Sequence, residues 1–224
     1  MSRFSIIIPT FNADKYIEKC LHSILKQSYS DYEIIIVDGA STDSTIDITR
    51  QFTESGLLKI HIEKDNGIYD AQNKGLSYAK GDWIIFLGAD DYFNDRNILL
   101  KISSITNENH DIVYGNVIVA GNTPWAHDGA IYDGQFCDQK ILIKNICQQA
   151  IFYNKKVFSK RAFNTKYRIC ADWDFNLYAW KQFKFSYFDI NICTFNAGGT
   201  STKNLYDSSF INDYQNNIKS YFYT

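Results

Sequence analysis

The sequence predicts an α/β fold in which helices cover both faces of a mostly parallel central sheet. Four short apolar runs in its front half alternate with three stretches of helical periodicity. The apolar runs are continuous in isoleucine and valine, a pattern typical of parallel strands that are buried on both faces. A chain of 224 residues is also long enough to fold as one large domain with a sizeable core.

The front of the chain contains the most regular elements. Strands are expected at 4–9, 32–38, 57–64 and 82–88, with helices at 14–28, 43–54 and 69–80 between them. The first helix carries an apolar stripe from Tyr16 to Leu25. Asp14 and Asp43 stand at the starts of the first two helices, where aspartate often caps free N–H groups.

The regular alternation ends after residue 108. Further strands are expected at 111–121, 148–154 and 183–195 and a helix at 172–182, whereas 122–146 shows no clear periodicity. The tail at 208–224 places apolar side chains at helical spacing. We interpret that tail as a helix packed on its own domain or on a dimer partner, with docking on a membrane as the alternative. The prediction is therefore one domain over 1–224, with an irregular half after residue 108.

Composition excludes several classes of protein. The formal net charge of −2 supplies no broad basic field, so nucleic acid is not an expected partner. No apolar run approaches the length of a membrane span, and the apolar start is too short for a signal peptide. Five cysteines without a CxxC spacing indicate reduced thiols in a cytoplasmic protein.

Polar residues follow each of the four front strands. The strand ends are Pro9–Asn12, Asp38–Ser41, Asp65–Gly67 and the pair Asp90–Asp91. Ends of parallel strands meet at one edge of a sheet, which is where ligands bind in such folds. A single aspartate at a strand end is usually a turn or a helix cap, but carboxylates at three ends favour a divalent metal, Mg²⁺ or Mn²⁺. Too few protein ligands are present for a closed site, so phosphate oxygens of a nucleoside diphosphate are expected to complete it.

Two long segments carry a resemblance to a known family. "FSIIIPTFNADKYIEKCLHSILKQSYSDYEIIIVDGASTDST" and "DNGIYDAQNKGLSYAKGDWIIFLGADD" resemble the inverting family 2 glycosyltransferases almost without gaps over 4–91. A shorter segment, "YRICADWDFNL", is similar to the later acidic motif of that family. The resemblance implies the Rossmann-like GT-A fold, with a nucleotide-sugar-binding half at 1–108 and an acceptor-side half with a C-terminal helix at 109–224.

The resemblance also implies an activity. Such enzymes use a divalent metal to move a hexosyl or N-acetylhexosaminyl group from a nucleotide-sugar to a hydroxyl group of a glycan or lipid-linked glycan. The expected setting is bacterial surface polysaccharide synthesis in the cytoplasm. A peripheral contact with the inner face of the membrane and a homodimer are left open.

Residue roles follow from the matched motifs. Asp172 corresponds to the catalytic base, and Asp91 and Asp90 correspond to the metal-binding pair. The expected donor-binding residues are Pro9, Thr10, Asn12, Asp38, Ala40, Asp65, Asn73, Lys74 and Asp90. Asp38 is expected to meet the base edge, where a carboxylate suits the N3–H donor of uracil and disfavours cytosine, so the expected donor is a UDP-sugar.

Some positions depart from the family pattern or allow another interpretation. Gly88 stands where the family often has a further acid, which leaves the metal to Asp90 and Asp91. Asp172 can also be interpreted as the N-cap of a helix starting at Trp173, with Asp174 as the next candidate base. Residues 198–202, "GGTST", are either a plain loop or a lid over the diphosphate.

Three other functions fit the pattern less well. A nucleotide-sugar pyrophosphorylase needs a glycine-rich basic loop after the first strand, and "PTFNADKY" is not one. A receiver-type signalling domain carries its acid pair after the first strand, whereas here the pair follows the fourth. A catalytically silent partner subunit would not require Asp90, Asp91 and Asp172, and only turnover distinguishes it.

Overall fold

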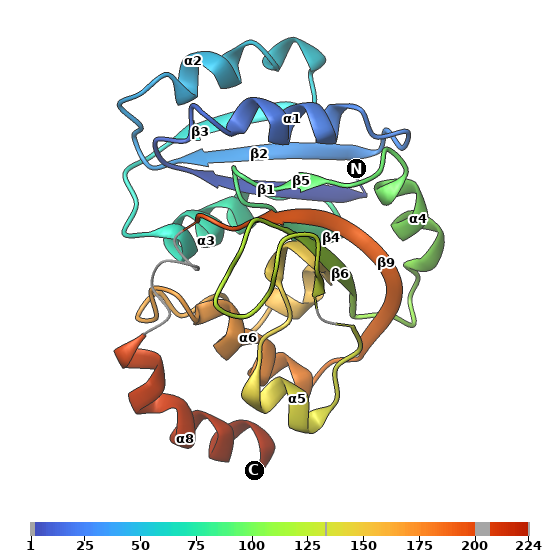
Figure 1. Cartoon of the computed structure of the whole chain (residues 1–224), viewed down its shortest axis with the longest axis vertical. Helices are drawn as coiled ribbons and strands as arrows, with labels where there is room; N and C mark the ends of the chain where they lie inside the picture. The colour runs from blue at the N-terminus through green and yellow to red at the C-terminus, as the bar shows by residue number, and fades with distance from the viewer. Residues whose placement is uncertain (1–2, 133, 200–206, 224) are drawn as a thin grey trace.

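The computed structural model describes residues 3–132, 134–199 and 207–223. Its nine strands form one mixed sheet in the order β3-β2-β1-β4-β8-β6-β9-β5, with β7 paired to β6 (Figure 1). The strands are β1 (Phe4–Thr10), β2 (Tyr32–Asp38), β3 (Leu58–Ile62), β4 (Trp83–Phe86), β5 (Tyr92–Phe93), β6 (Ile112–Ala120), β7 (Ile131–Tyr132), β8 (Ile151–Asn154) and β9 (Phe185–Asn196). The helices are α1 (Ile17–Leu25), α2 (Thr45–Arg50), α3 (Ile68–Tyr78), α4 (Ile98–Ile105), α5 (Asp138–Ile143), α6 (Ala171–Trp180) and α8 (Ser208–Phe222), with 3₁₀ turns at Thr53–Ser55, Gln148–Ala150 and Lys155–Phe158.

The front half is the expected parallel sheet. Strands β3, β2, β1 and β4 are parallel neighbours, and all seven residues of β1 are buried. Because side chains alternate between the faces of a strand, Ile6 and Ile8 join the core under α1, whereas Ile7 joins the core that contains α3. Figure 1 accordingly shows α1 and α2 on one face of the sheet and α3 on the other. This arrangement brings the carboxyl ends of the strands to one edge.

The back half makes the sheet mixed. Strand β8 is antiparallel to both β4 and β6, and β9 runs parallel to β6 and also pairs with β5 near its own end. The β6–β9 register shifts between Tyr114 and Val117. At this shift, a Cβ on Gly115 would lie 2.4 Å from the carbonyl oxygen of Ile190, so glycine permits the close approach of the two strands. Because of this irregular pairing, the end of β9 lies near the acid pair that follows β4.

One face of α3 joins the two halves. Tyr69 donates a hydrogen bond to the carbonyl oxygen of Ile169, and Gln72 and Gln148 exchange two amide hydrogen bonds of 2.9 and 3.1 Å. Because residues three and four apart share a helix face, Asn73 also reaches the back half of the chain, at Phe163. The front and back halves are therefore packed against each other.

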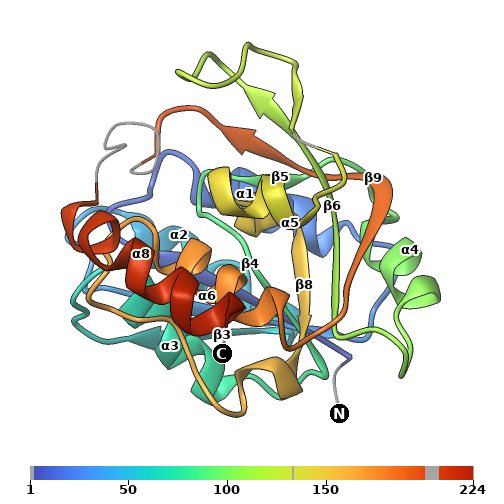
Figure 2. The ribbon, with the colours of Figure 1, turned by 90° about the horizontal axis from the view of Figure 1, so that it is seen from below.

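The C-terminal helix packs on its own domain, which is one of the three interpretations of the tail. Phe210 is 3% exposed and its ring lies against Trp173 and Tyr167. The Asn217 amide donates to Asp174 on α6 over 2.8 Å. Figure 2 shows α8 alongside α6.

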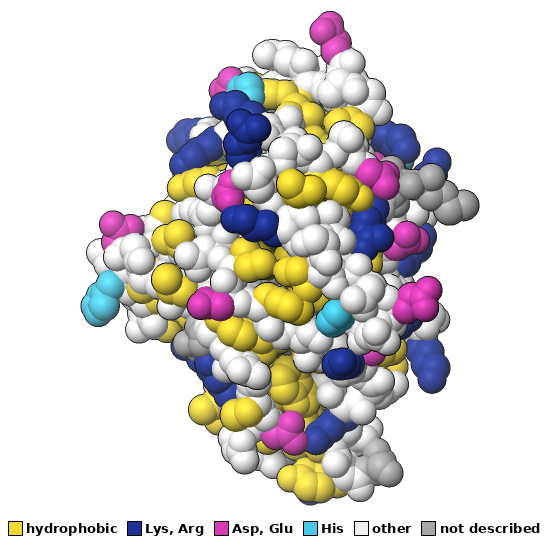
Figure 3. Space-filling view, turned by 90° about the vertical axis from the view of Figure 1, so that its right-hand side faces the viewer, with side chains coloured by type: hydrophobic (Ala, Val, Ile, Leu, Met, Phe, Trp, Pro, Cys, Tyr) yellow, Lys and Arg dark blue, Asp and Glu magenta, His cyan; other side chains and the backbone are white. Residues whose placement is uncertain are grey.

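Surface features do not single out one partner. Over the described ranges, no helix combines the length and apolar character needed to cross a bilayer. On the face in Figure 3, basic and acidic side chains are interspersed with strips of hydrophobic ones.

Several expected boundaries differ in the structure. The first helix ends at Leu25, because the Ser28 N–H donates to the carbonyl oxygen of Arg96 and draws the chain away from the helix axis. The expected strand at 148–154 begins with a 3₁₀ turn and becomes extended only at Ile151. The aperiodic region 122–146 contains the short elements β7 and α5, and neither α4 nor β5 was expected. Short elements held by tertiary contacts carry little periodicity for sequence patterns to detect.

Candidate active site

Asp38 organises the loops after β1 and β2. Its carboxylate accepts hydrogen bonds from the Thr10 hydroxyl, the Ser41 hydroxyl and the Ser41 N–H, each over 2.7 Å. Asp38 has no exposed surface, and Thr10 and Pro9 are buried with it inside the sheet. Three donors already occupy a carboxylate that solvent does not reach, and the expected contact of Asp38 with a base stays a prediction.

The two loops above Asp38 are locked in uncommon backbone conformations. Asn12 and Ala40 have φ angles of 50° and 64°, in the left-handed region that residues other than glycine rarely adopt. The Asn12 carboxamide accepts a hydrogen bond from the Thr42 N–H over 2.9 Å, and the Asn12 N–H donates to the Ser41 hydroxyl over 2.8 Å. Such conformations persist where the surrounding contacts enforce them, and they cluster at ligand sites. Both residues are exposed at the edge where the donor was expected.

An open patch adjoins these loops. Phe11 is 63% exposed, although it is a large aromatic residue. A Cβ on Gly39 would lie 3.4 Å from the Phe11 ring and 2.5 Å from Asp65 Oδ2, so this glycine allows the three residues to meet. Asp65 is half-buried and its Oδ1 accepts the Gly67 N–H over 2.9 Å. Phe11 and Gly39 were not predicted as site residues, and the sequence signal for them is an aromatic and a glycine immediately after strand ends.

Asn73 and Lys74 make contacts within the protein. The Asn73 side chain exchanges two hydrogen bonds with the Phe163 backbone, of 2.9 and 3.0 Å. The Lys74 ammonium donates to the carbonyl oxygen of Lys64 over 2.8 Å and forms an ion pair with Asp70 at 3.5 Å. Their expected contacts with the donor stay predictions, and the structure uses both side chains to hold neighbouring segments.

The acid pair lies at the carboxyl end of β4. Asp91 is 1% exposed, and its Oδ1 accepts the Asn196 N–H over 2.9 Å. Its Oδ2 is buried and has no hydrogen-bond partner among the described residues. Burial and the neighbouring Asp90 raise the pKa of Asp91 to about 7, whereas the Asn196 N–H and the nearby Gln149 side chain act in the opposite direction. A buried carboxylate oxygen without a partner is costly unless a cation or proton meets it.

The residues around the pair leave room for a metal ion. Asp90 is half-buried, and Gly199, at the end of the segment after β9, approaches it so closely that a Cβ there would lie 3.2 Å from Asp90 Oδ2. A Cβ on Gly88 would lie 2.5 Å from Asp91 Oδ2, so the missing family acid leaves the space beside that oxygen empty of side chain. No third metal-ligating side chain joins the pair within the described ranges. The donor set fits a divalent cation that shares its remaining coordination with phosphate oxygens.

Asp172 lies in the first turn of α6. Its Oδ1 lies 2.7 Å from the Tyr69 hydroxyl, whose single proton is shared with the carbonyl oxygen of Ile169 at 2.6 Å. Its Oδ2 accepts the Asn145 amide over 2.7 Å. The carboxylate remains partly accessible, and burial raises its pKa to about 6. Helix α6 begins at Ala171 with Cys170 at the N-cap position, so the alternative in which Asp172 caps a helix starting at Trp173 is wrong.

Asp174, the alternative base, has another role. It has no exposed surface and pairs with Arg161. Its other oxygen accepts hydrogen bonds from Asn217 and Tyr221 on α8, over 2.8 and 3.1 Å. Asp174 therefore joins α6 to α8 and is not available to a substrate. Of the proposed lid at 198–202, only Gly198 and Gly199 are described, and residues 200–202 lie outside the described ranges.

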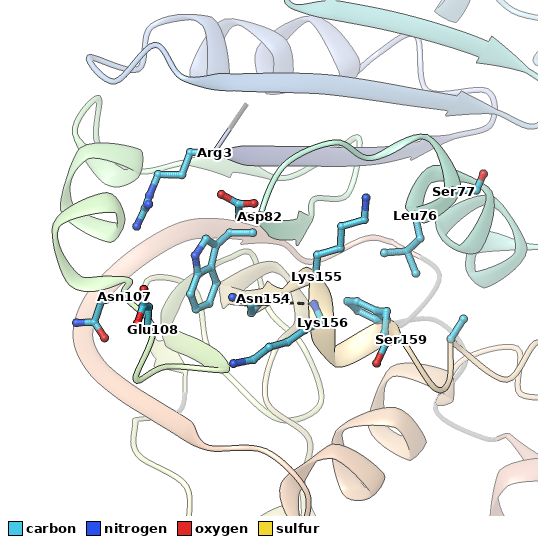
Figure 4. A pocket seen from close by; sticks show the side chains of 13 residues that line it. Arg3, Leu76, Ser77, Asp82, Asn107, Glu108, Asn154, Lys155, Lys156 and Ser159 are labelled. Carbon is cyan, nitrogen blue, oxygen red and sulfur yellow. Dashed lines mark hydrogen bonds between the residues drawn. The ribbon is translucent and has the colours of Figure 1, made fainter. Parts of the chain in front are cut away.

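A separate hollow of about 800 Å³ lies at the opposite edge of the sheet (Figure 4). It is lined by residues near the starts of strands, including Arg3 and Trp83, and by Lys155 and Lys156. Lys155 donates to the carbonyl oxygen of Ala79, and Lys156 forms an ion pair of 2.6 Å with Asp111. The hollow is distant from the acidic strand ends and forms no part of the candidate site.

Comparisons with known proteins find similar sequences. A family model described as Glycosyl transferase family 2 matches residues 5–170. A PGL/p-HBAD biosynthesis glycosyltransferase of Mycobacterium tuberculosis is 37% identical over 216 residues, which cover 93% of this chain and 82% of that protein. The UDP-Glc:alpha-D-GlcNAc-diphosphoundecaprenol beta-1,3-glucosyltransferase WfgD of Escherichia coli is 30% identical over 67% of this chain and 53% of that protein.

Solved structures show the same fold. The S. aureus TarS 1-349 structure in complex with UDP has a TM-score of 0.75 and 22% identity, and the match covers 88% of this chain and 60% of that one. The mannosyltransferase PcManGT from Pyrobaculum calidifontis, in complex with GDP-Man and Mn²⁺, has a TM-score of 0.70 and 19% identity over 89% of this chain and 58% of that one. The chain thus spans about three fifths of each of these two solved structures.

Proposed function

Because this chain belongs to the family 2 glycosyltransferases, of bacterial polysaccharide type, we propose that it is an inverting, metal-dependent enzyme that uses a UDP-sugar. The group transferred is a hexosyl or N-acetylhexosaminyl group, and the acceptor is a hydroxyl group of a glycan. The observation that carries the proposal is Asp91, whose buried Oδ2 lacks a partner at the strand end where Asp90 is also held.

The donor base is proposed to bind over Phe11 and Gly39. The exposed Phe11 ring offers a face for stacking, and Asp65 directs one oxygen toward Gly39. A carboxylate only accepts hydrogen bonds, so it suits the N3–H of uracil, whereas cytosine would present an acceptor there. We assign the direct contact to Asp65, and Asp38 holds the loops that shape the pocket. The UDP bound to TarS supports this choice, whereas the GDP-Man bound to PcManGT indicates that guanine is the competing base.

Asp91 and Asp90 would hold the metal ion together with the diphosphate. A bound divalent ion offsets the charge that develops on the departing diphosphate. Asp91 is fixed for this role by the Asn196 N–H, and Gly88 keeps side-chain atoms away from its open oxygen. Because Asp91 must be ionised to bind a cation, donor and metal are expected to bind together and more tightly above neutral pH.

Asp172 is proposed to remove the proton of the acceptor hydroxyl group. The Tyr69 hydroxyl and the Asn145 amide fix both of its oxygens, which aims the remaining lone pairs into the site. With a pKa of about 6, the carboxylate is largely ionised at neutral pH and is still basic enough to hold the proton that it takes. One base facing one leaving group is the requirement for a single displacement with inversion.

The proposed setting is the cytoplasm, at or near the inner face of the membrane. The name of WfgD includes an acceptor that is linked to diphosphoundecaprenol, which supports a lipid-linked glycan as acceptor. A homodimer and a peripheral membrane contact remain part of the proposal only as arrangements that would bring such an acceptor to the site.

A turnover screen tests the proposal. UDP-, GDP- and CDP-sugars are incubated with the protein and either Mn²⁺ or Mg²⁺, and release of nucleoside diphosphate is measured. We expect release from a UDP-sugar that requires metal and is lost in Asp91→Ala, while Asp47→Asn, a change at an exposed residue of α2, retains it. Binding of UDP without any turnover would instead identify a catalytically silent subunit, and full turnover in excess chelator would refute the role of the metal.

A further inference from the structure

Behind Asp172, side chains form a chain of hydrogen bonds that ends on its carboxylate. The Tyr153 hydroxyl donates to Asn176 Oδ1 over 2.8 Å, and Asn176 Nδ2 donates to Asn145 Oδ1 over 2.9 Å. Asn145 Nδ2 then donates to Asp172 Oδ2 over 2.7 Å. All three bonds point toward the carboxylate, and bonds aligned in this way polarise and strengthen one another.

The chain gives Asn145 a single orientation. Its amide oxygen already accepts from Asn176, so its amino group faces Asp172. If the Asn145 amide turned over, its oxygen would face a carboxylate oxygen, and its amino group would face the amino group of Asn176. Both contacts would be unfavourable, because each joins two acceptors or two donors.

Two of the hydrogen-bonded side chains lie in a buried position, where polar groups cost the fold free energy. Asn176 lies one helical turn after Asp172 on α6, and both Asn176 and Tyr153 have no exposed surface. The rings of Phe158 and Phe175 lie beside Tyr153 in the same core. Buried polar groups in an apolar core cost free energy unless every one is satisfied, and apolar residues of similar size would often pack there as well.

We propose that Asn145 and Asn176 are positioning residues for the transfer reaction: Asn176 fixes the orientation of Asn145, and Asn145 keeps Asp172 ionised and directed at the acceptor. This inference rests on the proposed function, in which Asp172 is the base. Neither asparagine touches the reacting atoms in this scheme.

Electrostatics around the carboxylate agree with this role. Burial raises the pKa of Asp172 to about 6, and the hydrogen bonds from Tyr69 and Asn145 act in the opposite direction by favouring the ionised form. Loss of the Asn145 donor should therefore raise the pKa further.

The pKa of Asp172 can be measured without interference from the other titratable groups that face it. They come from α3, β8, the 3₁₀ turn before β8 and the start of α6, and they are Tyr69, Tyr153, Cys147 and Cys170. Burial is the main cause that raises the pKa of each of these four groups above its ordinary value, so all four are neutral near pH 6. Among these groups, only Asp172 changes charge in that range.

The test is a carboxyl ¹³C NMR titration of the whole protein labelled at its aspartates. The Asp172 signal is identified by its absence in Asp172→Asn, and its midpoint is expected near pH 6. Asn145→Ala should move that midpoint upward by about one pH unit, since a hydrogen bond to a charged group is worth roughly that much. Asn176→Leu should move it in the same direction. Tyr153→Phe is the graded control, because it removes only the most distant donor and leaves the Asn176–Asn145 bond in place, so it should move the midpoint less than either asparagine variant.

Each outcome decides a separate question. An unmoved midpoint in Asn145→Ala overturns the inference, and because Asn145 is only half-buried, this variant remains informative if Asn176→Leu does not fold. Once a donor is known, the acidic limb of kcat, measured with saturating donor and metal, should follow the NMR midpoint of each variant, while the KM for donor at one fixed pH equals that of wild type. Turnover of Asp172→Asn tests the base itself. Retained turnover there refutes the proposed function, whereas lost turnover with an unmoved midpoint in Asn145→Ala refutes only the positioning role.

Discussion

Replacement of Asp91 by asparagine is expected to abolish transfer and yet stabilise the metal-free protein at alkaline pH. Burial and Asp90 raise the pKa of Asp91 to about 7 from an ordinary value of 3.8. A carboxyl group with a raised pKa in the folded state contributes most to stability below pH 4, and this contribution is lost as pH rises to about 7. The difference between the two pKa values corresponds to a cost of about 4 kcal/mol at pH 8.

Asparagine removes that cost and introduces a smaller one. Its oxygen can still accept the Asn196 N–H, and its amino group takes the position of Oδ2, where no acceptor was found. An unsatisfied buried donor costs about 1–3 kcal/mol, so the net gain at pH 8 should be about 1–3 kcal/mol. At pH 4.5 the ionisation cost has fallen to about 1 kcal/mol, and the variant should lose its advantage.

Urea unfolding measures this difference. Metal-free wild type and Asp91→Asn are unfolded at pH 4.5 and pH 8, with Asp47→Asn as a control for the loss of one exposed carboxylate. The stability difference between Asp91→Asn and wild type should change by about 3 kcal/mol between the two pH values. An equal difference at both pH values would refute the reasoning, because it would mean that Asp91 is not held ionised at a cost in the folded protein.

Further variants test the other parts of the site. Asp172→Asn should lower kcat about 10²–10⁴-fold and leave UDP binding by calorimetry unchanged, and a loss under tenfold would contradict its role as base. UDP should bind about ten- to a hundredfold more tightly than CDP, and Asp65→Ala should remove that preference; tighter binding of CDP by wild type would reverse the choice of donor. Gly39→Ala should weaken UDP binding about tenfold with little change in Tm, because its Cβ would push aside Asp65 Oδ2, which lies only 2.5 Å away. Asp207→Ala should lower stability by about 2 kcal/mol in thermal unfolding, since Asp207 accepts the Phe210 N–H at the start of α8 and the Ile169 N–H; a change below 0.5 kcal/mol, roughly the level of an ordinary surface substitution, would show that the cap is dispensable.

The sequence predicted the donor half of the fold well because that half is periodic. Buried strands and amphipathic helices leave continuous patterns, and β1, β2, β3, β4 and α3 all lie within two residues or so of their expected bounds. The acceptor half contains β7 and α5, elements of two and six residues that depend on tertiary contacts. Their positions could not be predicted from local patterns alone.

The sequence predicted several residues of the candidate site but not the contacts that they make. Strand-end polar residues predicted which edge of the sheet holds the candidate site, and the family resemblance supplied Asp172 as the candidate base. Burial then separated Asp38, which is enclosed, from Asp65, which is partly open, and no sequence pattern distinguishes the two. Likewise Asn145 lies in a region without periodicity, and only the folded chain brings it to Asp172, which is 27 residues away.

The double attachment of α3 has a consequence for protein engineering. Helix α3 belongs to the donor half by sequence, yet Tyr69, Gln72 and Asn73 are each hydrogen-bonded to residues of the acceptor half. A chimaera that joins this donor half to the acceptor half of another enzyme at residue 108 would leave three polar side chains facing a foreign surface. Recombination of acceptor specificity should therefore transplant these three positions of α3 together with residues 109–224, so that the exchanged unit is discontinuous in the chain.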